Sequence, residues 1–423
     1  MRLETLTENQ IIITFIALAL LLIFAHVFGN LAEKIKGPRV VGEILGGMIL
    51  GGSCLFLLFP NFANRIFFNY AEEGQVLNIF YQLGLIFLMF LSGYNTDIKL
   101  NKRNSKNITL VFLGATILPM LCAIPFINLF KDHFIGAMGN EISFGLVFCI
   151  GVAITSIPVI SKIFFDMGIM NTKFANTILT VATFQDLCLW ILLNIATGVA
   201  ATGDIDIPRM LIISATTLGL FAIVAFISHK IQHSEKPIKT RTLYTVSFIA
   251  LLLTCGTLSM LGINIMYSAF LVGYIDKALF GKTDHIKQKI ASIEDFAFTF
   301  FVPIYFALVG IQLNVIHDFS FLRFITFFVI AFMLEFIGTW LLLLFSKISR
   351  PARMNFAITM NARGGPGIVL ATVTYAAGII NLEFFTVLIL TTMLSSMIAG
   401  YYLRYQQRKN PKIFDSYEIE KTK

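Results

Sequence analysis

Four ionisable side chains inside long apolar stretches are the residues best placed to do chemistry: Asp186 in TVATFQDLCLWILL, Glu335 in FVIAFMLEFIGTW, Arg363 in MNARGGPG and Glu43 in VVGEILGG. Within a membrane, such a group is costly and marks a functional site by default. Asp186 is the strongest candidate because its apolar stretch contains no basic residue and Gln185 precedes it. Its carboxylate must lose a proton before it binds Na⁺ or K⁺, so competition between proton and cation would itself be an exchange mechanism.

Two apolar stretches are interrupted by residues that break helices. One has Thr155, Ser156 and Pro158 at its middle, and the other has Gly364, Gly365, Pro366 and Gly367. Each interruption alone is typical of an ordinary kink, but interruptions at matching places in two halves of a chain indicate a transporter's binding site. The oxygens of Thr155, Ser156 and Gln185, with carbonyls freed by an unwound stretch, are ligands that an alkali cation requires. Thr and Ser also commonly bond to a carbonyl one turn back.

The composition is that of a membrane protein made of helices. Of 423 residues, 57% are apolar and 13% are charged, whereas soluble domains contain about 25% charged residues. Stretches long enough to cross a bilayer occur near residues 10–29, 38–59, 76–94, 108–130, 142–165, 174–197, 208–228, 242–261, 263–280, 292–313, 321–345, 355–377 and 383–403. If the seventh stretch is a linker, the other twelve form two six-helix halves, and the interrupted fifth and twelfth stretches occupy equivalent positions.

The basic residues concentrate in alternate connections between these stretches. This pattern predicts an outside amino terminus and a cytoplasmic carboxyl terminus in the cell membrane, and it explains the net charge of +8 without a nucleic-acid partner. We expect a transmembrane domain over residues 1–405 and a short cytoplasmic tail over 406–423. The tail is too short for a nucleotide-binding domain, and no phosphate-binding glycine motif occurs. We therefore expect no cofactor and no use of ATP, and an ion gradient or a partner as the energy source.

The other charged residues have structural interpretations beside functional ones. Arg363 either compensates helix carbonyls or a carboxylate at the break, which we favour, or takes part in ion coupling. Glu335 either pairs with Arg363, which we favour, or is a second proton site, or faces a wet cavity. Glu43 is expected near the membrane interface with a structural role. The GxxxG spacings of Gly42 with Gly46, and of Gly47 with Gly51, predict close helix packing.

Five motifs in order resemble those of the second family of monovalent cation/proton antiporters, especially its Kef-type and related exchangers: PRVVGEILGGMILGGS, GLIFLMFLSGYNTD, AITSIPVISKI, TFQDL and ARGGPG. The resemblance covers residues 10–404. It implies an all-α antiporter fold of about thirteen transmembrane helices, arranged as two inverted six-helix repeats with crossed discontinuous helices. It further implies a core with helices near 108–197 and 321–403, a dimerisation or scaffold remainder, a homodimer, and elevator-like movement of the core.

The resemblance also assigns roles to individual residues. Asp186 takes the position of the family's ion-binding aspartate and Gln185 the position before it, while Thr155 and Ser156 fall at the first helix break. Electrogenic members carry two acids where this chain has Gln185 and Asp186, and they commonly have a lysine on the helix that corresponds to 321–345, where this chain has only Glu335. A single exchanging carboxylate implies electroneutral exchange of one proton for one Na⁺ or K⁺. A sodium-coupled symporter of an organic solute and an ion channel are the alternatives.

Overall fold

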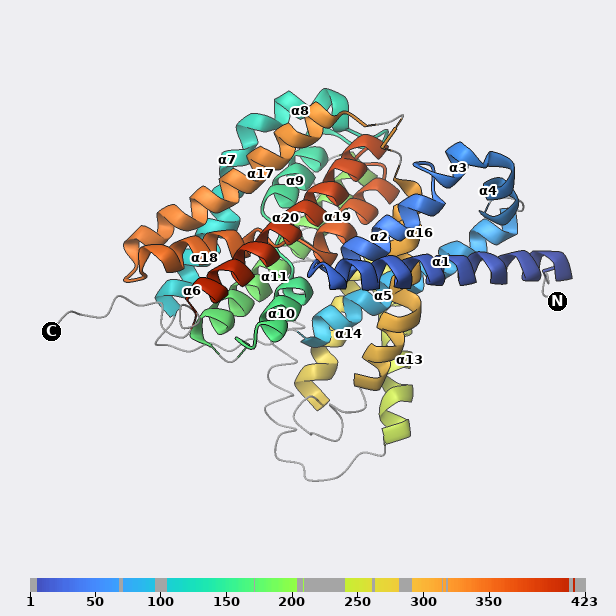
Figure 1. The fold of residues 1–423 in the computed structure, drawn as a ribbon, viewed down its shortest axis with the longest axis horizontal. Coiled ribbons are helices and arrows are strands. Elements are labelled where there is room, and N and C mark those ends of the chain that lie inside the picture. Colours follow the sequence, from blue (N-terminus) through green and yellow to red (C-terminus); the bar gives the residue numbers. More distant parts are fainter. Residues whose placement is uncertain are drawn as a thin grey trace. The chain divides into compact units, whose positions relative to one another are not determined.

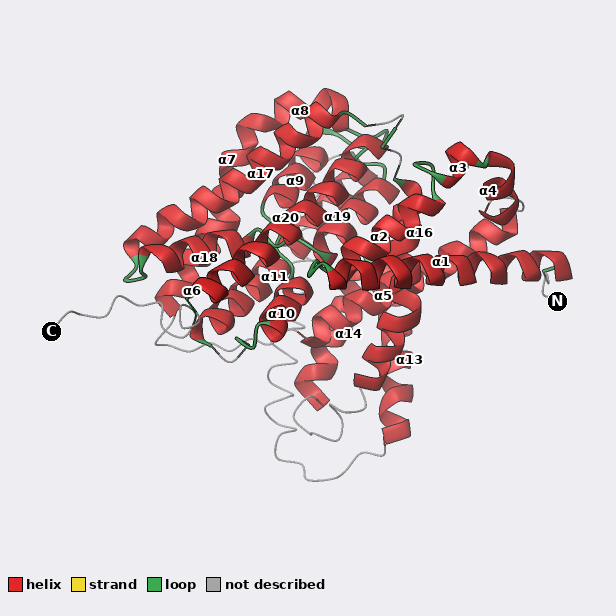
Figure 2. Cartoon of the chain, in the orientation of Figure 1, coloured by secondary structure: helices red, strands yellow, loops and turns green. Residues whose placement is uncertain are grey.

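The computed structural model describes residues 6–67, 71–95, 105–170, 172–203, 208, 240–260, 263–280, 291–313, 315–316, 319–410 and 414. These residues form helices and loops (Figure 2). None of the described residues forms a strand, and one isolated β-bridge joins Ile135 and Ile380. Nine helical segments of the described part are long and apolar enough to cross a membrane. The chain divides into two compact units, Met1–Asn95 with Thr217–Asp318, and Thr96–Thr216 with Phe319–Lys423.

The first unit contains the blue and yellow helices of Figure 1. They are α1 (Glu8–Lys34), α2 (Arg39–Leu50), α3 (Leu55–Leu58), α4 (Pro60–Phe67), α5 (Ala71–Asn95), α13 (Thr240–Met260), α14 (Ile265–Phe280), the π-helix η4 (Ala297–Phe301) and α16 (Val302–Gln312). The predicted stretch 38–59 is not one helix, because α2 ends at Leu50 and a turn over residues 51–54 separates it from α3.

Glycines let α2 pack closely against α1 on one side and α16 on the other. A Cβ atom on Gly42 would lie 2.0 Å from the carbonyl oxygen of Phe28 on α1. A Cβ atom on Gly47 would lie 2.0 Å from the carbonyl oxygen of Ala307 on α16. Backbones approach this closely only where a side chain is missing, so the close packing predicted from the GxxxG spacings is confirmed.

Glu43 is buried beneath a small polar network of the first unit. Its side chain is 4% exposed, and its Oε1 accepts a hydrogen bond of 2.9 Å from Nε of Arg39. Arg39 also lies 2.6 Å from Nδ1 of His26, whose Nε2 lies 2.8 Å from the carbonyl oxygen of Thr299 in η4. Burial with a partner explains how the carboxylate is accommodated. This pairing agrees with the structural role expected for Glu43, and its place near the membrane interface stays a prediction.

The second unit holds the residues singled out by their chemistry. Its elements are α6 (Ser105–Phe112), the π-helix η2 (Leu113–Ile117), α7 (Leu118–Ala123), η3 (Ile124–Phe126), α8 (Ile127–Phe134), α9 (Glu141–Val152), α10 (Ile157–Asp166), α11 (Lys173–Thr202), α17 (Phe321–Leu342), η5 (Leu343–Phe345), α18 (Arg350–Met360), α19 (Gly365–Ala376) and α20 (Leu382–Lys409). Helix α20 continues to Lys409, so the first residues of the predicted tail are helical.

Every predicted transmembrane stretch other than the seventh coincides with helical structure among the described residues. The seventh, near 208–228, lies outside the described residues except for position 208. The count of thirteen helices and the two inverted repeats therefore stay predictions.

Candidate ion site in the second unit

Both predicted helix breaks are present, and both open a few residues before the proline. Helix α9 ends at Val152 and α10 begins at Ile157, while α18 ends at Met360 and α19 begins at Gly365. Pro158 is the second residue of α10, and Pro366 is the second residue of α19. Gly365 and Gly367 flank Pro366 in the first turn of α19. Proline is tolerated there because its missing N–H would have had no partner in the helix.

The two breaks lie against each other. The backbone N–H of Ser156 donates to the carbonyl oxygen of Ala362 over 2.8 Å, and the Thr155 hydroxyl lies 2.6 Å from the carbonyl oxygen of Met360, the last residue of α18. Gly364 has a φ of +113°, and a Cβ atom on it would lie 2.5 Å from Oγ of Ser156. The crossing thus requires glycine at position 364 for its backbone conformation and for the space.

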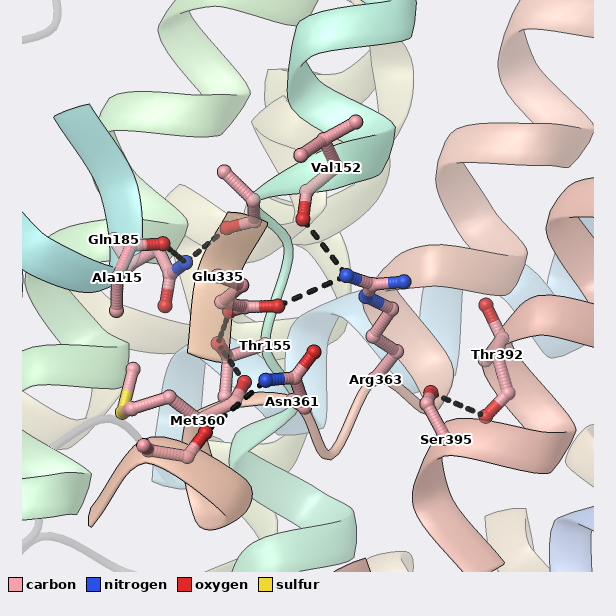
Figure 3. A network of polar contacts seen from close by, with 12 residues as sticks. Ala115, Val152, Thr155, Gln185, Glu335, Met360, Asn361, Arg363, Thr392 and Ser395 are labelled. Carbon is pink, nitrogen blue, oxygen red and sulfur yellow. Dashed lines mark hydrogen bonds and ion pairs between the residues drawn. The ribbon is translucent and has the colours of Figure 1, made fainter. Parts of the chain in front are cut away.

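An ion pair is buried at the crossing (Figure 3). Nη2 of Arg363 lies 3.0 Å from Oε2 of Glu335, and their side chains are 1% and 0% exposed. The same nitrogen donates over 2.8 Å to the carbonyl oxygen of Val152, the last residue of α9, and the Thr155 hydroxyl lies 3.1 Å from Oε1 of Glu335. Arg363 therefore neutralises a carboxylate and the negative end of a half-helix together. The pairing of Glu335 with Arg363 that the sequence favours is present.

A close helix contact brings Glu335 to the crossing. Gly338 of α17, one turn after Glu335, would carry a Cβ atom 2.4 Å from the carbonyl oxygen of Gly114 in η2. Two facing glycines let the backbones of α17 and η2 meet, which carries the Glu335 side chain into the interior of the unit.

Gln185 connects this π-helix to the first break. Its Nε2 donates to the carbonyl oxygen of Ala153 at the break and, over 3.4 Å, to that of Ala115 in η2. Ala115 lies four residues before Pro119, which has no N–H to occupy that carbonyl. Sequence reasoning missed the π-helix, and Pro119 inside an apolar stretch is the signal that could have indicated it.

Asp186 takes no part in the hydrogen bonds described above for the crossing. It is 1% exposed, and within the described part of the chain neither of its carboxylate oxygens has a hydrogen-bond partner. It lines a cavity of about 10 Å³, whose other lining residues are Ile150, Ile154, Leu189, Trp190, Leu193 and Leu370. Such a space holds about one water-sized body. A buried carboxylate without a partner is unfavourable unless it binds a proton or a cation.

The structure thus separates the predicted site residues into two groups. Thr155, Glu335, Arg363 and the amide nitrogen of Gln185 share one network, and Ser156 caps α10 by accepting a hydrogen bond of 3.4 Å from the N–H of Val159. Asp186 stands apart at the cavity. Neither Thr155 nor Ser156 lines this cavity, so their predicted role as ion ligands stays a prediction, as does that of Gln185.

Comparison with known proteins identifies the family. A family model described as "Sodium/hydrogen exchanger, transmembrane" matches residues 16–405. The chain belongs to this family. Its relatives are transporters, which confirms the expectation that the chain is not an enzyme. The resemblance to cation/proton antiporters is likewise confirmed.

Named relatives match at low identity over most of this chain. The Na⁺/H⁺ antiporter NhaS4 of Synechocystis is 24% identical, and the match covers 93% of this chain and 96% of that protein. The Na⁺/H⁺-K⁺ antiporter GerN of Bacillus cereus is 24% identical over 92% of this chain and 95% of its own length. Cation/H⁺ antiporter 17 of Arabidopsis thaliana is also 24% identical, and the chain spans about half of it, 48%.

A solved structure shows the fold. The sodium proton antiporter MjNhaP1 of Methanocaldococcus jannaschii matches with a TM-score of 0.64 and 16% identity, covering 94% of this chain and 97% of its own. The all-helical antiporter fold is therefore shared.

Proposed function

We propose that this protein is a secondary active antiporter that exchanges a monovalent cation, Na⁺ or K⁺, for H⁺ across the membrane. The observation that carries the proposal is the Asp186 carboxylate, buried beside a cavity with both oxygens free of partners in the described structure. The names of the relatives, which are antiporters of Na⁺, K⁺ and H⁺, support the same activity.

Competition at Asp186 accounts for the coupling. The protonated carboxyl carries no charge and offers a cation little attraction, whereas the carboxylate attracts a cation strongly in a desolvated site. The Asp186 site can cross the membrane only when a proton or a cation neutralises its carboxylate, because a bare buried carboxylate is costly. Proton and cation then move in opposite directions through one group.

The exchange is proposed to be electroneutral. Arg363 and Glu335 neutralise each other at 3.0 Å, so Asp186 is the buried carboxylate left to change its charge among the described residues of the second unit. One carboxylate exchanges one proton for one monovalent cation, and no net charge moves.

Alternating access is proposed to come from elevator-like movement of the second unit, which contains both half-helix pairs and Asp186. We further propose that the protein is a homodimer in the cell membrane, with its amino terminus outside and its carboxyl terminus in the cytoplasm.

The test is exchange in proteoliposomes that contain a trapped pH dye. After a pH gradient is imposed, Na⁺, K⁺ or Li⁺ is added in turn to wild type, to Asp186→Asn and to a matched control, Asp166→Asn. Asp166 is partly exposed and pairs with Lys162 over 3.2 Å at the end of α10. We expect cation-driven proton flux in wild type and control, unchanged when the membrane voltage is clamped to zero, and none in Asp186→Asn. Retained exchange in Asp186→Asn would refute the role of this residue.

Cation flux that needs no proton gradient would indicate a channel. Sodium uptake that depends on an organic solute would indicate a symporter. Either outcome replaces antiport.

A further inference from the structure

The buried face of α11 changes in character at Asp186. Side chains three, four and seven residues apart share one face of a helix. One turn before Asp186 this face carries two small residues, Ala182 and Thr183, which are both buried. In the two turns after Asp186 it carries three bulky apolar residues: Leu189, Trp190 and Leu193.

The bulky residues of α11 belong to a closed apolar layer around the small cavity beside Asp186. Six apolar side chains, called the apolar layer below, line this cavity: Ile150 of α9, Ile154 of the first break, Leu189, Trp190 and Leu193 of α11, and Leu370 of α19. Each of them is at most 4% exposed. The surface of the cavity is wholly apolar, so the oxygens of Asp186 do not open into it. Cavities without polar partners stay empty of water, and the layer is therefore dry.

The apolar layer lies between Asp186 and one end of the second unit. Asn140, directly before α9, donates over 3.3 Å to the carbonyl oxygen of Gly203, directly after α11. The N–H of Met138 donates over 2.9 Å to the carbonyl oxygen of Gly378, two residues past α19. The start of α9 and the ends of α11 and α19 are thus together at this end, which faces outside in the proposed topology.

We propose that the apolar layer is a permanent barrier, and that proton and cation reach Asp186 only from its other side, where α11 carries Ala182 and Thr183. This inference rests on the proposed function, since it takes Asp186 as the group that exchanges the two ions. An ion in a dry apolar layer would lose its hydration without replacement, which is prohibitive.

A barrier of this kind accounts for tight coupling. If protons could reach Asp186 from both sides at once, they would pass through the carboxyl group without any cation moving in the opposite direction. A layer that never opens leaves one approach to Asp186. Alternating access then requires movement of the whole unit, which carries that approach from one side of the membrane to the other.

The first test places a polar group in the apolar layer. Leu193→Asn and Leu370→Asn each introduce an amide, which is close to leucine in size and can bind water. The matched control is Leu403→Asn, since Leu403 on α20 is 0% exposed but does not line the cavity. Proteoliposomes receive a pH gradient without any exchangeable cation, while a permeant lipophilic ion compensates the charge. The decay of the gradient then measures the proton leak.

We expect wild type and the control to hold the gradient equally well. Leu193→Asn and Leu370→Asn should raise the leak by about tenfold or more, because an amide that binds water lowers the cost of bringing a proton into the layer. Variants that exchange cations normally and leak no faster than wild type would overturn the proposal while leaving antiport in place.

The second test leaves the apolar layer intact. The other tryptophan of the chain, Trp340 on α17, does not line the cavity, so fluorescence of the Trp340→Phe variant reports on Trp190 alone. Quenching by acrylamide should be weak, and it should stay unchanged when Na⁺ or K⁺ is added and when the pH is raised or lowered.

Quenching that increases under any of these conditions would mean that the layer opens in place, and it would overturn the permanent barrier. Absence of exchange for every cation in wild type would instead overturn the proposed function.

Discussion

Replacing Arg363 by Met is expected to destabilise the protein severely, and replacing Glu335 by Met as well is expected to restore most of the loss. Both side chains are buried, at 1% and 0% exposure, and lie 3.0 Å apart. Removing one partner of a buried ion pair costs roughly 3–5 kcal/mol, because the other charge stays buried without compensation. With both charges gone that cost disappears. What is left is the carbonyl oxygen of Val152, which loses its donor at a cost of about 1–3 kcal/mol.

The free energy of unfolding is measured by titrating mixed micelles with SDS and following the helical circular dichroism. The control is Arg323→Met, since Arg323 pairs with Glu383 over 2.7 Å but is 36% exposed. Its loss should cost below about 1 kcal/mol. A double variant no more stable than Arg363→Met would mean that the two residues are not coupled, and it would refute the assignment of Arg363 as the counter-ion of Glu335.

Two glycine substitutions test close backbone packing, one between helices of the first unit and one at the crossing in the second unit. Gly47→Ala places a Cβ atom 2.0 Å from a carbonyl oxygen of α16, and it should destabilise the protein by roughly 1–3 kcal/mol or more in the same SDS titration; Gly256→Ala, with nothing within 4 Å of its Cβ position, should not, and equal effects would contradict the close contact. Gly364→Ala must strain a φ of +113° and push against Ser156, so exchange in proteoliposomes should be lost. Gly168→Ala, strained at +69° but in open space, should retain exchange, and loss in both would mean that the crowded crossing is not the cause.

The main site residues could be identified in the sequence because burying a charge in a membrane costs free energy. Asp186, Glu335 and Arg363 stand out because a charge inside an apolar stretch needs a reason. The two helix breaks were visible because Pro158 and Pro366 cannot continue a helix. The preferred partner of Arg363 also follows from elementary electrostatics, since a carboxylate lay on the preceding helix.

The side chains that bond to the π-helices could not be predicted in the same way, because they are distant in sequence. Pro303 has no N–H for the carbonyl of Thr299, four residues earlier, and His26 lies 2.8 Å from that oxygen. Pro119 has the same relation to Ala115, whose carbonyl accepts from Gln185. A proline signals that a carbonyl is released, but which side chain takes it is decided by packing between helices.

Residue type alone does not separate the groups that build a membrane site from the group that works in it. Thr155, Ser156 and Gln185 all carry oxygens suited to a cation. In the structure the Thr155 hydroxyl contacts the other break, the Ser156 hydroxyl caps α10, and the Gln185 amide nitrogen donates to the first break. A break exposes backbone groups that must find partners in the absence of water, so most polar side chains nearby are needed for that purpose. Within the described residues the amide oxygen of Gln185 and both oxygens of Asp186 have no hydrogen-bond partner. Of these two side chains only the carboxyl of Asp186 can release a proton, so we infer that it is the group over which a proton and a cation compete.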